Sequence, residues 1–99
     1  MAKDIVITSR AYKRMPSEFK DSLGFTKFYH DGYEVGISDN LNREDTVRTC
    51  VHEGMHIVIT ILQEKGWIPK ELKGKKEENC CYLAEDIIYR LIDKHYLST

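Results

Sequence analysis

The stretch that decides the fold of this chain is His52-Glu53-Gly54-Met55-His56. It matches the HExxH pattern, in which two histidines four residues apart lie on one face of an α-helix and can bind the same metal ion. The glutamate lies about 100° further round the helix, beside the metal. The pattern therefore predicts His52 and His56 as zinc ligands and Glu53 as the general base that takes a proton from a zinc-activated water.

The sequence around this motif predicts a long helix at the centre of a domain. Asn42, with Asp45 three residues later, forms a variant of the capping box that marks a helix start. Apolar residues recur at three- and four-residue steps from Val47 to Leu62, and Gly66 follows as a stop signal. The second half of this segment is apolar nearly all round, as expected of a buried helix.

A catalytic zinc site takes three protein ligands and leaves one position for water, so a third ligand is needed. Residues 77–92 predict a second, antiparallel helix with acids at its N-terminus, where the helix dipole favours them. Glu78 is our choice because it follows His56 by 22 residues (78 − 56), enough for the first helix to end and the chain to return. Glu85 and Cys81 share its helix face and are the alternatives.

The second helix also carries an apolar stripe. Leu83, Ile87 and Leu91 recur every four residues, and we expect the wide stripe that they form with the neighbouring Ala84, Ile88 and Ile92 to pack on the first helix.

Two β-rich runs, residues 25–30 and 33–38, flank Asp31-Gly32 and predict a β-hairpin with a type I′ turn. Residues 4–8 resemble a short strand, and residues 16–24 a short helix ended by glycine. The expected fold is α+β, in the order β-α-β-β-α-α. A small β-hairpin or sheet would pack on the HExxH helix and an antiparallel glutamate helix.

The strand before the HExxH helix has an inside and an outside, because apolar and polar residues alternate along it. As an edge strand it would align an extended peptide through main-chain hydrogen bonds, and Gly36 would let the peptide backbone come close. We therefore predict Tyr33, Val35 and Gly36 as substrate-binding residues. The alternative is that the hairpin only covers one side of the helix pair.

The chain resembles the smallest gluzincin metallopeptidases, the single-domain minigluzincins, and compact HExxH proteins of bacterial and phage genomes. Those families have a β-hairpin, an HExxH helix and a second helix with a glutamate ligand, to which residues 77–83 are similar. The resemblance implies a zinc-dependent metallopeptidase whose ligands and general base are His52, His56, Glu78 and Glu53. Tyr82, one turn beyond Glu78, would correspond to the residue that stabilises the oxyanion in larger members; the alternative is a tyrosine at the edge of the core.

Two other functions stay open. Cysteine could supply the third ligand, since Cys81 shares the face of Glu78 and Cys50 precedes His52 by two residues. Cysteine with HExxH resembles the peptide deformylases, although their glycine-cysteine segment is missing before this helix; the reaction would then be hydrolysis of a small amide. The other reading is a catalytically silent binding or regulatory module with a structural zinc. Such a site needs four protein ligands and has no use for Glu53 beside the metal.

Composition and charge limit the function classes. The chain has 99 residues, 41% of them hydrophobic, and a formal net charge of −1. This fits a single minimal zincin-like domain over residues 1–99 and argues against broad electrostatic binding to nucleic acid, so we expect a peptide or protein substrate as the partner. There is no signal-peptide core and no apolar run of the ~18 residues that cross a membrane. Three cysteines, an odd number, fit a reducing compartment, and we expect a cytoplasmic protein. The sequence does not indicate an oligomeric state.

Overall fold

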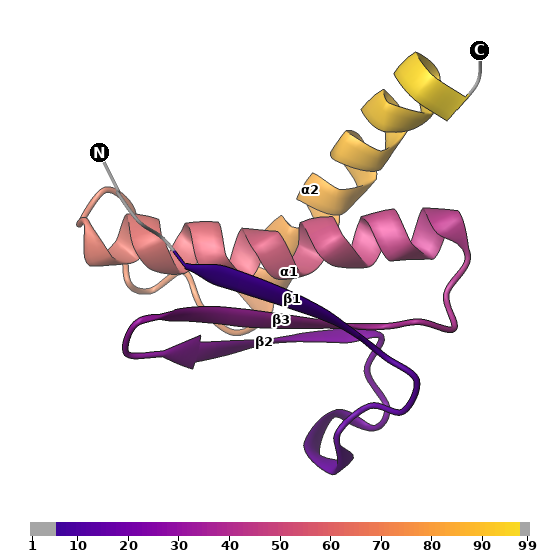
Figure 1. Ribbon diagram of the computed structural model, residues 1–99. Helices are drawn as coiled ribbons and strands as arrows, with labels where there is room; N and C mark the ends of the chain where they lie inside the picture. The colour runs from indigo at the N-terminus through magenta and orange to yellow at the C-terminus, as the bar shows by residue number, and fades with distance from the viewer. Residues whose placement is uncertain (1–5, 98–99) are drawn as a thin grey trace.

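A mixed three-stranded sheet packs against two helices in the computed structural model, which describes residues 6–97. The elements are β1 (Ile7–Tyr12), a 3-10 turn η1 (Ser17–Phe19), β2 (Gly24–Tyr29), β3 (Gly32–Ser38), α1 (Arg43–Glu64), α2 (Lys75–Ile92) and a π-helical turn η2 (Asp93–Leu97). The strand order is β1-β3-β2, with β1 parallel and β2 antiparallel to β3. Figure 1 shows α1 lying across one face of the sheet, and α2 crossing α1 with its C-terminal half pointing away. The predicted α+β fold is confirmed.

Both ends of α1 lie where the sequence predicts them. The Asn42 side chain accepts a hydrogen bond from the Asp45 backbone N–H at 2.8 Å, which satisfies a donor that the helix leaves free. At the other end Gly66 has a φ of +74°, and the Trp67 N–H donates to the Leu62 carbonyl at 2.9 Å, as in a Schellman motif. Local capping chemistry therefore fixes the length of the helix that carries the HExxH motif.

The core lies between α1 and one face of β3. Val35 and Ile37 of β3 and Ile57 of α1 are buried together, with Tyr33 and Ile61 packed at the margin. Because β-strand side chains alternate between faces, these β3 residues all point to α1. Their burial holds α1 against the sheet and thereby places the HExxH motif next to β2.

The hairpin is confirmed, but its turn lies one residue earlier than predicted. Tyr29 pairs with Gly32, so the two-residue loop is His30-Asp31 and Gly32 is the first residue of β3. A Cβ atom on Gly32 would lie 2.5 Å from the Val6 carbonyl oxygen. That glycine is therefore needed for the close approach of the chain just before β1, and not for the turn.

Two predictions for the N-terminal part are wrong in detail. The strand expected over residues 4–8 is found over Ile7–Tyr12, while residues 4 and 5 lie outside the described residues. The helix expected over 16–24 is a single turn, Ser17–Phe19, and Gly24 already belongs to β2. Pairing with β3 gives residues 9–12 hydrogen-bond partners that their own sequence does not indicate.

The outer residues of the apolar stripe of α2 do not pack on α1, contrary to prediction, although its other edge is partly half-buried. Leu83, Ile87 and Leu91 are 62%, 48% and 61% exposed, and α2 instead turns Glu78 and Glu85 toward α1. The histidines of α1 contact these carboxylates, so α2 packs on α1 through its polar face.

Neither helix in residues 6–97 is both long and apolar enough to cross a bilayer.

Candidate metal centre

The HExxH residues lie where α2 crosses α1. His52 and Glu53 are buried, and His56 is largely covered. The two imidazole rings stand at 71° to one another with their centroids 5.1 Å apart. One helical turn thus presents both rings to the same side of α1, toward the first three turns of α2.

The carboxylate of Glu78 bridges the two histidines. Its Oε1 lies 3.0 Å from Nε2 of His52, and its Oε2 lies 2.9 Å from Nε2 of His56. Two ligands that are each about 2.0–2.1 Å from a tetrahedral zinc lie roughly 3.3 Å from one another. The structure brings a different oxygen of Glu78 to each nitrogen at a distance close to this separation. Among the described residues, the group whose single ligand atoms all lie within 4.8 Å of one another is His52, His56 and Cys81.

The outer nitrogens of both rings also contact carboxylates. Nδ1 of His52 lies 2.9 Å from Oε1 of Glu85, and Nδ1 of His56 lies 2.5 Å from Oε2 of Glu77. Metal-binding histidines commonly hold a carboxylate in this way, which fixes the ring and its tautomer. Glu85, the alternative ligand from sequence, thus lies on the far side of its histidine. The sequence reasoning gave Glu77 no role; its only signal was its place beside Glu78.

The protonation of the rings decides what fits between them. A neutral imidazole has one N–H donor and one lone pair, and a carboxylate only accepts. In a neutral ring that donates its proton from Nδ1 to Glu85 or Glu77, Nε2 presents a lone pair to an oxygen of Glu78. Such facing acceptors need a proton or a cation between them. A divalent cation matches this donor set, because two imidazole nitrogens and one carboxylate are the ligands of a known class of catalytic zinc site.

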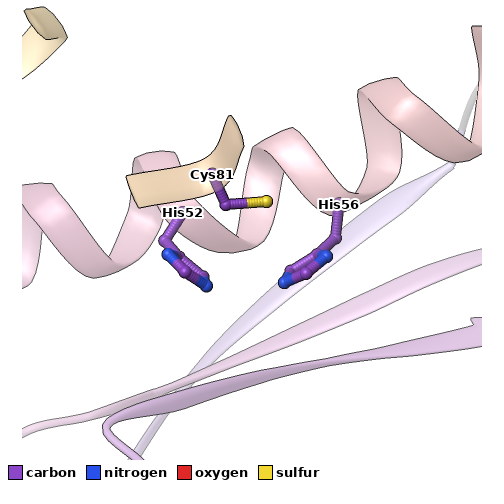
Figure 2. Close-up of side chains that lie close together, drawn as sticks. All are labelled: His52, His56 and Cys81. Carbon is purple, nitrogen blue, oxygen red and sulfur yellow. The ribbon is translucent and has the colours of Figure 1, made fainter. Parts of the chain in front are cut away.

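Cys81 lies close to the same two histidines. Its sulfur and one nitrogen of each ring all lie within 4.8 Å of one another, and Figure 2 shows the sulfur pointing between the rings. The residue is fully buried, and burial, together with nearby carboxylates that include Glu78, raises the pKa of its thiol to about 12. Without a metal the thiol is therefore protonated at neutral pH.

The side chain of Glu53 contacts β2. Its Oε1 accepts a hydrogen bond of 2.7 Å from the Thr26 hydroxyl. A cleft of about 620 Å³ opens beside it, and its walls come from β2 and the loop before it, α1 and α2; among its lining residues are Thr26, Phe28, His52, Glu53, Glu78 and Tyr82. Base, histidines and bridging carboxylate therefore face one solvent-accessible space.

Tyr82 lies at the rim of this cleft. Its ring packs on the His52 ring with centroids 4.6 Å apart, and it is 59% exposed. The residue is therefore largely exposed, with its ring beside the histidine pair.

The predicted substrate-binding residues Tyr33, Val35 and Gly36 are misplaced. They belong to β3, which is the central strand and is paired on both sides, so it has no free edge for a peptide. The space beside Gly36 is filled, since a Cβ there would lie 2.1 Å from the Phe25 ring. The prediction failed because it did not foresee that β1 pairs with β3, which leaves β2 as the edge beside the cleft.

Comparison with known proteins does not assign the chain to a family. No protein-family model, curated protein or solved structure matches it. What the centre can do therefore follows from its own donor atoms, their distances and the cleft beside them.

Proposed function

We propose that this protein is a minimal, gluzincin-type zinc metallopeptidase with His52, His56 and Glu78 as its three metal ligands. The observation that carries this proposal is the carboxylate of Glu78, which reaches Nε2 of both histidines while Glu85 and Glu77 occupy the outer nitrogens. A binding site built from three protein ligands leaves one coordination position for water or substrate, as hydrolysis requires.

Bound zinc would supply Lewis acidity, which polarises the scissile carbonyl and makes a water acidic near neutral pH. Glu53 accepts a proton from that water as the water oxygen bonds to the carbonyl carbon. When the carbon–nitrogen bond breaks, Glu53 passes the proton to the leaving amine. Tyr82, at the rim of the cleft, is the side chain we assign to stabilising the oxyanion.

The free edge of β2 is the place we assign to the substrate. The Ser38 N–H donates to the Leu23 carbonyl at 2.9 Å, so these two residues form a hydrogen-bonded pair of the β2–β3 ladder. Because such pairs alternate in an antiparallel ladder, the main-chain groups of Gly24, Thr26 and Phe28 face the open edge. An extended peptide can add to that edge and lie along the cleft.

We place this activity in the cytoplasm, acting on a peptide or protein. Cys50, Cys80 and Cys81 are all free thiols, which suits a reducing compartment.

The test of hydrolysis is a peptide-library digest with zinc-loaded protein, read by mass spectrometry. We expect cleavage that a chelator abolishes and added zinc restores. Glu53→Gln should lower the rate by roughly 10²-fold or more while zinc binding is unchanged, because the base is lost and the ligands are kept. Glu64→Gln, an exposed glutamate at the end of α1, is the control and should cleave normally. Cleavage that survives in Glu53→Gln would contradict the proposal.

The position of Cys81 favours one second candidate, a cysteine-ligated site. If Cys81 replaced Glu78 as the ligand, the reaction would be hydrolysis of a small amide, such as that of an N-formyl group. If both bound the metal, four protein ligands would close the site and make it structural. X-ray absorption of the zinc-loaded protein shows whether Cys81 is a ligand, since a zinc–sulfur distance near 2.3 Å differs from zinc–nitrogen and zinc–oxygen distances near 2.0–2.1 Å. We expect no sulfur ligand.

A further inference from the structure

The hydroxyl of Thr26 is hydrogen-bonded to the residue that we assign as the general base. Thr26 Oγ1 lies 2.7 Å from Oε1 of Glu53 and 3.3 Å from the Glu53 carbonyl oxygen. Within residues 6–97 this hydroxyl is the one hydrogen-bond donor to the Glu53 carboxylate. Glu53 is only 8% exposed, so the single hydrogen bond largely determines where its carboxylate points.

Thr26 belongs to the edge strand β2, so its contact with Glu53 links the candidate peptide-binding edge to the general base. The ladder alternation places its main-chain N–H and carbonyl at the open edge, while its side chain points to α1. One residue therefore has its backbone where a peptide would pair and its hydroxyl on the base. Movement of β2 on peptide binding would be transmitted directly to the carboxylate.

We propose that Thr26 is a positioning residue for Glu53: its hydroxyl holds Oε1 and leaves Oε2 to accept the proton of the attacking water. This inference rests on the proposed peptidase function. The hydrogen bond also compensates a buried charge, so its loss would both free the carboxylate to rotate and leave it without a partner.

Kinetics of two threonine variants test the proposal. Thr26→Val keeps the shape and removes the hydroxyl, and we expect kcat to fall by roughly tenfold or more, with KM and zinc content close to unchanged. Thr26→Ser keeps the hydroxyl and should restore most of the rate. Thr8→Val removes a hydroxyl that contacts the Tyr33 carbonyl on the opposite edge strand and should cleave normally. Unchanged kcat in Thr26→Val, or an equal loss in Thr26→Ser, would overturn the proposal.

A measurement without turnover tests the contact itself. Urea unfolding of the metal-free chain, Thr26→Val, Glu53→Met and the double variant forms a double-mutant cycle. We expect the pair to be coupled by roughly 10- to 100-fold in the folding equilibrium constant, as for hydrogen bonds to charged groups. Zero coupling would overturn the inference. Failure of the proposed function would show as inactivity of the unsubstituted protein. If that inactive protein still showed coupling between Thr26 and Glu53, the hydrogen bond would be structural, and the positioning role would also be overturned.

Discussion

The two histidines of the centre each contact carboxylates through both ring nitrogens. Glu78 lies at both Nε2 atoms, while Glu85 and Glu77 lie at the Nδ1 atoms of His52 and His56. A carboxylate on Nδ1 fixes the ring orientation and makes the opposite nitrogen a better metal ligand. Glu85 and Glu77 would therefore act on a bound metal through the imidazoles.

This arrangement predicts a loss of metal affinity in variants that never touch the metal. Glu85→Gln and Glu77→Gln should each weaken zinc binding by roughly 10- to 100-fold, because an amide accepts a weaker hydrogen bond from the imidazole. Competition with a fluorescent chelator measures the effect, and Glu71→Gln, an exposed loop substitution, is the control. Wild-type affinity in both variants would show that these carboxylates do not orient the ligands.

At the level of secondary structure, two glycines of different elements should respond oppositely to alanine. A Cβ on Gly36 of β3 would lie 2.1 Å from the Phe25 ring, which stacks on Phe19 with centroids 4.6 Å apart. Gly36→Ala should therefore cost about 1–3 kcal/mol in the free energy of unfolding, the usual range for overpacking. A Cβ on Gly54 of α1 meets nothing within 4 Å, so Gly54→Ala should stabilise the metal-free chain by about 0.5–1 kcal/mol. Urea denaturation checks both, and equal effects would contradict the described packing.

The exposed face of α2 and the buried face of α1 should respond differently to substitution. Leu91 lies on the exposed face, whereas Ile57 of α1 is only 4% exposed. Leu91→Ser should change the free energy of unfolding by less than about 0.5 kcal/mol, and Ile57→Ala should lower it by about 2–5 kcal/mol. Thermal unfolding at low protein concentration measures both. A cost for Leu91→Ser as large as that for Ile57→Ala would mean that the outer face of α2 is covered in solution.

Sequence reasoning succeeded where structure depends on neighbouring residues. The start of α1 at Asn42 and its end at Gly66 follow from capping chemistry within a few residues, and the helical spacing of His52 and His56 follows with them. The choice of Glu78 rested on its distance of 22 residues from His56, and the structure brings this residue to both histidines. Its role as a metal ligand stays a prediction.

Reasoning failed where distant segments choose their partners. The exposed β1 carries no signal that it pairs with β3, so the sequence alone predicts Gly36 as an edge residue. The face of α2 that packs on α1 differs from the prediction, since Glu85 contacts His52 of α1 while Leu83 and Leu91 are exposed. The sequence also gives no signal for Thr26, because only the fold places it beside Glu53.

At the scale of the whole molecule, a sheet, two crossing helices and one cleft hold a centre that we propose binds a single zinc. The most direct test is the zinc content per chain, measured by elemental analysis on untagged protein for the native sequence, Glu78→Ala and the exposed control Glu64→Ala. We predict near one zinc per chain in the native protein and the control, with clear loss in Glu78→Ala. A native chain that binds no zinc even after reconstitution would contradict the account, and full retention in Glu78→Ala would transfer the third ligand to Cys81 or Glu85.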